Sequence, residues 1–438
     1  MGRKKRKSTE RNGRNMSNTF PRDLQYAKFS AYGFLKNLRF FEPFMVLFLL
    51  EAGLSYLQVG TLYAVREILV NVMEIPSGAV ADGLGRRRTM VVSFLGYLIS
   101  FAFFWFGSTM LLFLVAIFFF SVGEAFRTGT HKAMIFSYLR INNLQEYGND
   151  YYGHTRSWSQ IGSAISAIIA AAIVFATRNY RAVFLFSMIP YVVDLLLMLT
   201  YPKELDGPTE RISLQSIREN FRKVGRGLRE TARRPGAARA VLSASSFGGF
   251  YKGGKDYLQP MISALALSIP VAHSLSVQRR EALLIGLAYT LIYLLTSVAS
   301  RTSATVAKRF RSPESALNWL LAIGLGLALS AGLSRWGEWT LLPVILFLTI
   351  FVLQNFRQPV GVSVVAERIP EEVLATVLSA QSQLQSLFAA VVAFFVGATA
   401  DYIGGNVGLG LTLSAGLGIL LFPLLRVTPL PEPEQTDG

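Results

Sequence analysis

The chain alternates long apolar runs with short polar segments, and the runs have the length of membrane helices. A helix needs about 20 mostly apolar residues to cross the hydrocarbon layer of a membrane. The pattern predicts twelve such spans, at 30–50, 57–81, 89–106, 110–135, 153–176, 180–200, 238–266, 281–304, 314–334, 339–364, 373–400 and 405–427. We therefore expect an all-α, multi-pass membrane protein.

One long hydrophilic interruption divides the spans into two sets of six. The predicted regions are a cytoplasmic basic tail at 1–29, an N-terminal six-helix bundle at 30–200, a cytoplasmic amphipathic linker at 201–237, a C-terminal six-helix bundle at 238–427 and a disordered tail at 428–438. The first twenty residues contain no apolar stretch of the kind found in cleaved signal peptides. Two such halves predict parallel repeats about a pseudo-two-fold axis along the membrane normal, with a site between them.

The linker contains a basic segment with helical periodicity. Its apolar residues recur at helical spacing and its basic residues occupy the other faces. The apolar set is Leu214, Ile217, Phe221, Val224 and Leu228. This pattern predicts an amphipathic helix on the anionic lipids of the inner leaflet, with a merely solvated linker as the alternative.

Lysine and arginine are distributed unevenly between the two sides of the predicted bundle. The segments 1–29, 86–88, 201–235 and 301–311 hold 25 of them, whereas the six connections on the other side hold 5. Cytoplasmic loops carry the excess of basic residues in membrane proteins. Both termini are therefore predicted to lie in the cytoplasm, and the chain in the cytoplasmic membrane.

Composition excludes several classes of function. Hydrophobic residues make up 52% of the chain and charged residues 16%, so the net charge of +16 reads as a topology signal rather than a nucleic-acid surface. The chain has no cysteine and three histidines, which argues against disulfides, thiol catalysis and His/Cys metal clusters. We expect no enzyme activity, cofactor or metal, and a monomer that binds a small molecule.

The turn between spans 2 and 3 carries a recognisable motif. It reads Pro76-Ser77-Gly78-Ala79-Val80-Ala81-Asp82-Gly83-Leu84-Gly85-Arg86-Arg87-Arg88. This segment resembles the signature G-x-x-x-D-[RK]-x-G-[RK]-[RK]-[RK] of the major facilitator superfamily, except that Gly83 stands where a basic residue is usual. With twelve spans in two sets of six, the resemblance covers the whole chain and implies transport by alternating access.

Each residue type in this motif has a physical use. Gly78 allows close approach to a neighbouring helix, Asp82 offers a carboxylate to a helix N-terminus or an arginine, and Gly85 permits a tight turn. The three arginines Arg86, Arg87 and Arg88 are expected to contact anionic headgroups. The resemblance implies that Gly78 and Asp82 stabilise one of the two access states.

Other motifs of the superfamily are missing or displaced. Span 5 has small residues but lacks the proline found in drug/proton antiporters, and Arg127 in span 4 precedes Gly129 by two positions where four is customary. Antiport is therefore not supported by a motif.

Charged residues inside spans are expensive, at about 2.5–3.5 kcal/mol each, so they mark pathways or internal pairs. The resemblance implies that spans 1, 4, 7 and 10 line a central cavity. Residues predicted for a substrate and proton pathway on these spans are Arg39, Glu42, Glu124, Arg127, His131, Lys252, Lys255, Asp256, Gln354, Asn355 and Arg357.

Helical spacing suggests how some of these residues pair. Lys36 and Arg39, and likewise Arg39 and Glu42, are three apart and would share a face. Lys252 and Asp256 are i,i+4 partners by the same rule. For spans 4 and 7, a self-compensated pair that fixes helix rotation is the alternative to a pathway.

Spans 2 and 6 hold a second set of intramembrane charges. Glu67, Asn71 and Glu74 fall on one helical face, whereas Arg66 and Glu67 are sequence neighbours that should find partners elsewhere. Asp194 lies alone among aliphatic residues in span 6 and is a proton carrier or, more simply, a packing hydrogen bond.

The charged cavity candidates have an excess of positive charge. The basic set is Arg39, Arg127, Lys252, Lys255 and Arg357, against Glu42, Glu124 and Asp256. Such a field favours an anionic solute, and the neighbouring aromatic residues suit an amphipathic one.

We predict a secondary transporter that moves a small organic solute by alternating access and is coupled to protons through at least one carboxylate. A multidrug-type efflux antiporter and a non-transporting membrane sensor or scaffold of the same fold are the alternatives.

Overall fold

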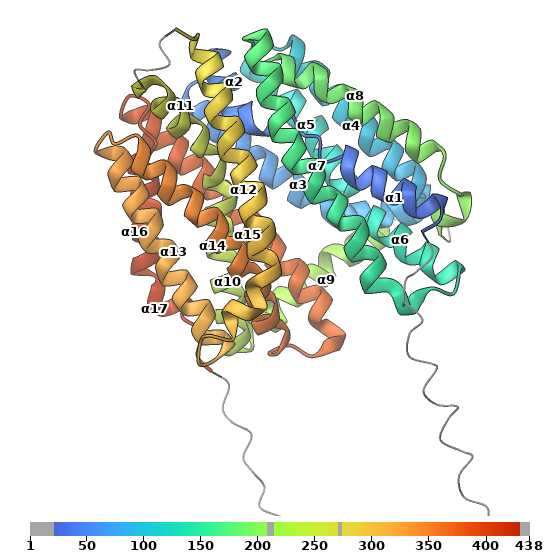
Figure 1. The fold of residues 1–438 in the computed structure, drawn as a ribbon. Helices are drawn as coiled ribbons and strands as arrows, with labels where there is room; N and C mark the ends of the chain where they lie inside the picture. Colours follow the sequence, from blue (N-terminus) through green and yellow to red (C-terminus); the bar gives the residue numbers. More distant parts are fainter. Residues whose placement is uncertain (1–21, 208–213, 270–273, 430–438) are drawn as a thin grey trace, which may run out of the picture.

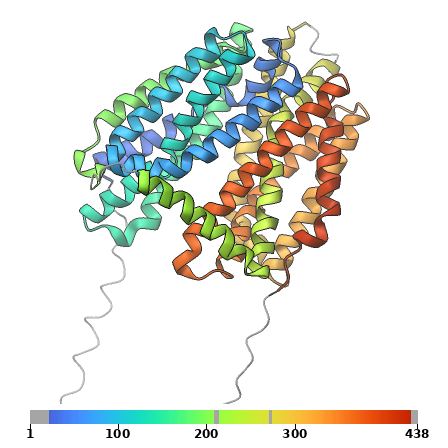
Figure 2. The ribbon, with the colours of Figure 1, turned by 180° about the vertical axis from the view of Figure 1, so that it is seen from behind.

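The computed structural model describes residues 22–207, 214–269 and 274–429, and nearly all of these residues are helical. Figure 1 shows the helices in two groups, with α1 to α8 on one side and α10 to α17 on the other. Helix α9 lies between the groups, as the view from behind shows most clearly (Figure 2).

The first group contains the helices formed by predicted spans 1 to 6. They are α1 (Leu24–Leu35), α2 (Met45–Glu51), α3 (Tyr56–Leu84), α4 (Arg86–Phe106), α5 (Met110–Arg127), α6 (Thr130–Ile141), α7 (Gly148–Thr177) and α8 (Ala182–Leu199), with short 3₁₀ helices η1 (Glu42–Phe44), η2 (Gln145–Tyr147) and η3 (Lys203–Asp206). Helix α1 begins at Leu24, so residues 24–29 belong to the bundle and not to the predicted tail.

The second group follows the linker helix α9 (Leu214–Ala232) and corresponds to predicted spans 7 to 12. Its helices are α10 (Pro235–Gly254), η4 (Lys255–Tyr257), α11 (Leu258–Ser268), α12 (Val277–Ala307), α13 (Pro313–Trp336), α14 (Leu341–Ala366), α15 (Glu371–Tyr402), α16 (Gly408–Leu420) and α17 (Phe422–Leu425). Helix α10 already begins at Pro235, three residues inside the predicted linker.

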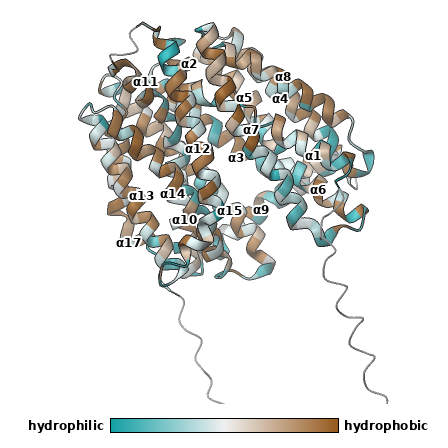
Figure 3. Ribbon diagram, viewed as in Figure 1, coloured by the Kyte–Doolittle hydropathy of each residue, from teal (hydrophilic) through white to brown (hydrophobic). Residues whose placement is uncertain are grey.

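Within the described residues, eight helical stretches are long and apolar enough to cross a membrane. Spans 1 and 7 fall outside this set because each is broken in its middle, and α3 because it carries several charges. Helix α16 is apolar but short. The long helices consist mainly of hydrophobic residues (Figure 3). On α8 and α12 the exposed apolar residues include Ile189, Leu196, Leu287, Leu294 and Val298.

The molecule has two distinct ends. One end, at the bottom of Figure 1, carries α6, α9 and α17 and holds most basic segments; we call it the basic end. The opposite end carries α2, α11 and the α7–α8 turn, and we call it the far end.

The two groups of helices pack against each other along α3 and α15, and along α7 and α12. Near the far end this packing is very close. A Cβ atom placed on Gly60 would lie 2.6 Å from the carbonyl oxygen of Ala393, and one on Gly397 would lie 2.4 Å from that of Tyr56. Because only glycine lets backbones approach so closely, Gly60 and Gly397 allow α3 and α15 to close the far end.

The two groups separate toward the basic end. Around Gly78, no described atom other than those of its chain neighbours and its own helix backbone lies within 4 Å of an added Cβ. The close helix approach expected of Gly78 is therefore wrong for this conformation, because the basic end of α3 has no packed neighbour at that point.

Helix α9 confirms the helical part of the linker prediction. It packs on α15, α3 and α10, and therefore touches both groups of helices. Thr231 is buried, while Phe221 keeps 43% of its surface exposed. One part of α9 is thus covered by protein and another remains accessible.

Candidate functional site

Spans 1 and 7 are broken at equivalent places in the two groups of helices. Helix α1 ends at Leu35, and α2 resumes at Met45 only after an irregular stretch and η1. Helix α10 ends at Gly254 and continues through η4 into α11. The expectation of one continuous helix in each span was wrong. Broken helices at matching positions are how many transporters present polar groups at the membrane midplane.

Span 4 is interrupted as well. Helix α5 ends at Arg127, and α6 starts at Thr130. Between them Gly129 has φ of 81°, a conformation that other residues rarely adopt. The break turns the chain after Arg127, so His131 does not lie on the helical face that Glu124 and Arg127 share in α5.

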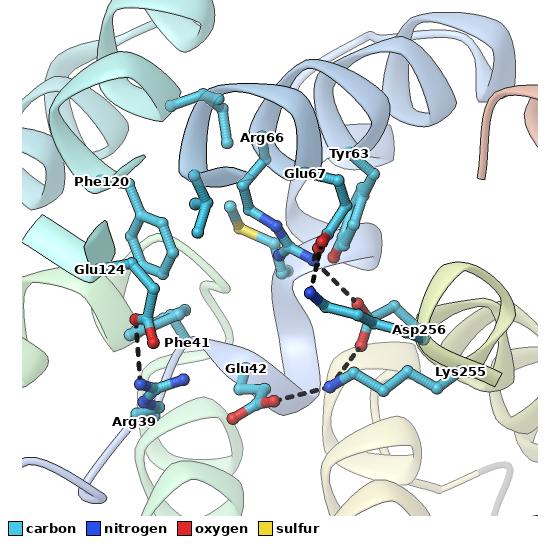
Figure 4. Close-up of a pocket in the computed structure, with 14 residues that line it drawn as sticks. Arg39, Phe41, Glu42, Tyr63, Arg66, Glu67, Phe120, Glu124, Lys255 and Asp256 are labelled. Atoms are coloured by element: carbon cyan, nitrogen blue, oxygen red, sulfur yellow. Dashed lines mark hydrogen bonds and ion pairs between the residues drawn. The ribbon is translucent and has the colours of Figure 1, made fainter. Parts of the chain in front are cut away.

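The side chains from these breaks meet in a cavity of about 170 Å³ between the two groups, which we call the central cavity (Figure 4). Its walls come from η1, α2, α3, α5, α10 and η4 and the residues before η1. The lining residues are Arg39, Phe41, Glu42, Met45, Tyr63, Arg66, Glu67, Val70, Ile117, Phe120, Glu124, Lys252, Lys255 and Asp256.

Three ion pairs in this cavity connect the two groups of helices, and we call them the interhalf ion pairs. The Nζ of Lys255 lies 2.8 Å from Oε1 of Glu42, and the Nζ of Lys252 lies 2.6 Å from Oε2 of Glu67. A guanidinium nitrogen of Arg66 lies 3.9 Å from Oδ2 of Asp256. Glu67 and Asp256 are buried and the other four side chains are partly buried, so breaking a pair leaves a poorly solvated charge without its partner.

A second set of contacts lies entirely within the first group. Arg39 pairs with Glu124 at 3.2 Å, and Arg127 pairs with the other oxygen of the same carboxylate. The hydroxyl of Tyr97 donates to Glu124 and accepts from Arg127 at 3.2 Å. Glu124 is therefore a fixed hub, and its pairing with Arg127 agrees with their helical spacing.

The expected pair of Lys252 with Asp256 was wrong. Lys252 contacts Glu67 and Ser386 instead, because α10 ends at Gly254 and the i,i+4 rule applies only within a continuous helix. Arg66 and Glu67 have the partners elsewhere that were expected, Asp256 and Lys252, but they also contact each other at 3.1 Å.

The expected shared face on span 1 was also wrong. The chain from Lys36 to Phe41 is not helical. Arg39 consequently turns toward Glu124, while Glu42 turns toward Lys255 in the other group.

The expected excess of positive charge is not found at the central cavity. Among its lining residues in the described chain, Arg39, Arg66, Lys252 and Lys255 stand opposite Glu42, Glu67, Glu124 and Asp256. The balance differs because Arg66 and Glu67 contribute, whereas Arg127 and Arg357 are not part of the wall.

The candidates on span 10 lie away from the central cavity. Arg357 is 1% exposed and donates to the carbonyl and hydroxyl oxygens of Ser243, with its guanidinium over the ring of Phe247. Asn355 donates to the backbone of Phe351, and Gln354 is buried. Arg357 therefore fixes α14 against α10.

The remaining intramembrane candidates occupy separate places. His131 stacks on Tyr32 at 3.6 Å and contacts the hydroxyl of Tyr201 at 3.2 Å, on the basic side of the central cavity. Asp194 is fully buried, and neither of its carboxylate oxygens has a hydrogen-bond partner among the described residues. Glu67 and Asn71 share a face toward the second group, since Asn71 donates to the carbonyl of Gln383.

The chain matches a known protein family over most of its length. A family model described as Major Facilitator Superfamily matches residues 31–393. The chain belongs to this superfamily. It is therefore an integral, multi-pass membrane protein of a transporter family, and the predictions of family and fold are confirmed.

Among curated proteins, the chain is similar to the uncharacterised MFS-type transporter YxaM of Bacillus subtilis (strain 168), at 22% identity over 398 residues, which cover 91% of this chain and 93% of that protein. Solved structures of similar fold include the nucleoside transporter NupG, with a TM-score of 0.73 at 13% identity over 92% of this chain and 98% of that one. A bacterial homologue of the lysosomal transporter Spinster, in an inward-facing and unoccupied conformation, has a TM-score of 0.67 at 16% identity over 92% and 96%. These likenesses show the fold.

The superfamily's signature turn has a partner that the sequence did not indicate. Asp206 of η3 accepts a hydrogen bond from the backbone N–H of Arg87 at 2.7 Å and so caps the start of α4. Asp82, to which this type of contact was assigned, is exposed and forms no ion pair within the described part of the chain. Asp206 carries no sequence signal of this role, because it lies far from the motif in the chain.

Two of the three motif arginines contact other parts of the protein. Arg86 donates to the hydroxyl of Ser137, and Arg87 donates to the carbonyl of Tyr201 at 3.2 Å. Of the three arginines, only Arg88 is exposed. Gly85 has φ of 88°, in agreement with the tight turn expected there.

Sequence reasoning also missed Gln259, which binds the broken segments of spans 1 and 7 together. Its carbonyl oxygen accepts from the N–H of Val46 at 2.8 Å, and its amide donates to the carbonyl of Glu42 at 2.9 Å. A fully buried glutamine directly before Pro260 in an apolar run was the available signal.

Proposed function

We propose that the protein is a secondary transporter that moves a small organic solute across the cytoplasmic membrane by alternating access, coupled to protons. The observation that carries this proposal is the set of interhalf ion pairs. They join the two groups of helices across a cavity at matching helix breaks, close to the packed far end. Contacts of this kind must open and close when the two groups rock against each other.

The direction of access follows from the charge distribution. The basic end carries the lysine and arginine excess that marks the cytoplasmic side of membrane proteins. With the far end closed around Gly60 and Gly397, the conformation described here is then inward-facing and both termini lie in the cytoplasm.

The interhalf pairs suggest which carboxylates take part in coupling. Protonation of Glu42, Glu67 or Asp256 would neutralise one member of a pair that joins the two groups and so weaken closure of the far end. Glu124 differs because both of its basic partners belong to its own group. Glu67 is held by two close cations, Lys252 at 2.6 Å and Arg66 at 3.1 Å. We infer that Glu42 or Asp256 instead couples proton movement to the conformational change, and that Glu124 fixes the geometry of the cavity.

The cavity wall also bears on the solute. Its charges balance, and Phe41, Tyr63 and Phe120 add aromatic surface beside them. A solute with polar groups and an organic body can exchange its own contacts for those of the ion pairs, which avoids leaving any charge unpaired in a dry site.

The test is transport by the purified protein in liposomes under an imposed pH gradient. A mixture of small metabolites is supplied, and accumulated solutes are identified by mass spectrometry. Wild-type protein should concentrate at least one solute when the gradient is present. Glu42→Gln or Asp256→Asn should abolish uphill accumulation while sparing exchange.

Glu124→Gln is the matched control, and it should weaken both uphill transport and exchange together. If no solute is moved by the wild type, the protein is not a transporter. If both amide variants concentrate the solute with wild-type pH dependence, the proposed coupling is wrong.

A further inference from the structure

A second cavity of about 440 Å³ lies on the basic side of the central cavity, and we call it the basic vestibule. It is enclosed by α1, α6, α7 and the turn between α5 and α6. Its polar lining residues include Lys36, Asn37, Arg127, Thr128, Lys132 and Arg156.

The vestibule is strongly cationic. Within the described chain its wall holds four basic side chains, those of Lys36, Arg127, Lys132 and Arg156, together with the imidazole of His131 and no carboxylate. Of the four, Arg127 is compensated by Glu124, and the others form no ion pair with any described carboxylate. Unpaired cations around a cavity attract an anion.

Two carboxylates lie near this wall without belonging to it. Asp194 interacts electrostatically with Lys36 and Arg127, and Glu74 with Arg127. Neither lines the vestibule. They reduce the positive potential near Lys36 and Arg127 but leave Lys132 and Arg156, which are exposed at the opening, uncompensated.

The start of α6 adds hydrogen-bond donors to the same wall. Gly129 turns the chain so that this 12-residue helix begins at the vestibule, and no side chain of the described residues caps its first turn. Free N–H groups and the helix dipole at such an end favour bound oxyanions. The hydroxyl of Thr128 and the amide of Asn37 lie at the same wall.

Arg127 joins the vestibule to the central cavity. Its guanidinium contacts Glu124, which lines the central cavity, and Arg127 itself lines the vestibule. An anion in the vestibule therefore competes with Glu124 for Arg127. Binding in the vestibule would therefore change the contact between Arg127 and Glu124, and with it the charge at the wall of the central cavity.

We propose that the basic vestibule, lined by Lys132 in the first turn of α6, Arg156 of α7 and Arg127, binds the phosphate or carboxylate group of the transported solute. This inference rests on the proposed transport function and names its substrate class, an organic anion whose uncharged body reaches toward the central cavity. The same chemistry would bind an anionic lipid headgroup, and the test separates the two sources.

The experiment measures binding of phenyl phosphate to the full-length protein in nanodiscs by isothermal titration calorimetry, with phenol as the uncharged analogue. In zwitterionic lipid the wild type should bind phenyl phosphate and not phenol. Lys132→Gln combined with Arg156→Gln should weaken binding about tenfold or more, because two charge-assisted contacts are lost. Both side chains are exposed, so the variant should fold.

Matched controls and a second lipid complete the test. Arg178→Gln with Arg335→Gln removes two basic residues at the far end and should leave the affinity unchanged. Equal affinity of the vestibule variant and the wild type, or equal binding of phenol, would overturn the proposal. A second result would also overturn it. In nanodiscs that contain phosphatidylglycerol, the wild type would no longer bind phenyl phosphate, and the purified wild type but not the vestibule variant would retain that lipid. The vestibule would then be a site for a lipid headgroup.

The outcome is distinguishable from failure of the transport proposal. A protein that concentrates a solute in liposomes but does not prefer phenyl phosphate contradicts the vestibule proposal alone. A protein that binds phenyl phosphate through Lys132 and Arg156 but moves no solute contradicts the transport proposal alone.

Discussion

Single side chains in this protein act mainly by joining elements that are distant in the chain. Gln259 holds the broken parts of spans 1 and 7 together, and Glu42 and Lys255 connect the two groups of helices. The types of residue at the site could be predicted from the sequence, because charges inside apolar runs are rarely tolerated without a purpose. Their partners could not, since helical spacing says nothing about contacts beyond a helix end.

At the residue scale, Asp206 should contribute to stability through the cap that it forms at α4. Asp206→Ala should lower the free energy of unfolding by about 1 kcal/mol, the usual cost of losing such a cap. Thermal unfolding of the purified protein measures this. Asp82→Ala is the matched control because Asp82 is exposed. Equal melting temperatures for wild type and Asp206→Ala would show that the cap is not important.

At the scale of elements, all twelve apolar runs correspond to helical segments, because burial of apolar side chains in a membrane depends on composition and length alone. The breaks in spans 1 and 7 could not be predicted. No glycine lies between Phe34 and Pro43, and the irregular stretch there is held by tertiary contacts with α5, η4 and α11 rather than by local preference. Span 7 offered a weak signal in its Gly253-Gly254 pair.

The close packing of α3 on α15 leads to a prediction for Gly60. Gly60→Val should prevent full closure of the far end, because the added atoms would meet the backbone of α15. Val46 is buried, so a cysteine introduced there by Val46→Cys should react slowly with a membrane-impermeant maleimide while Gly60 is present. We expect the same cysteine to react faster when Gly60→Val is added. Gly416→Val, where an added Cβ has no described neighbour within 4 Å, should not change the rate. If the introduced cysteine reacts equally slowly with and without Gly60→Val, Gly60 is not needed to close the far end.

Helix α9 should bind anionic lipid through the basic residues that the protein does not cover. Replacing Arg222, Lys223 and Arg226 by glutamine should remove the extra thermal stability that phosphatidylglycerol gives over phosphatidylcholine. Each basic residue near such a surface contributes about 1 kcal/mol. The far-end variant Arg178→Gln is the control. If phosphatidylglycerol stabilises the triple variant as much as the wild type, α9 does not bind anionic lipid through these residues.

At the scale of the whole molecule, two groups of helices packed closely at one end and separated at the other match one of the two states that the proposed alternating access requires. The sequence predicted the two groups and the basic end, since both follow from the order of runs and the positions of lysine and arginine. It could not predict which state the chain adopts, because the two states share the same helices and differ only in contacts between the groups.

The exposed position of Asp82 leads to a prediction about this equilibrium. Asp82 is exposed and makes no ion pair with the described residues here, and we expect it to stabilise the other access state, in which the basic end is closed. Asp82→Asn should therefore increase the population of the conformation described here several-fold, as expected for loss of one charge-assisted contact. Cross-linking across the basic end should become slower. If the cross-linking rate is the same in Asp82→Asn and the wild type, Asp82 does not affect the conformational equilibrium.

Distances between spin labels at both ends test the central claim of alternating access most directly. The chain has no cysteine, so labels can be introduced at Ser108 and Asp401 for the far end and at Asn142 and Arg311 for the basic end. Loss of the interhalf ion pairs in Lys252→Met with Lys255→Met should lengthen the far-end distance and shorten the basic-end distance in the same fraction of molecules. Distances that stay unchanged at both ends, in this variant and across pH, would contradict alternating access around the interhalf ion pairs.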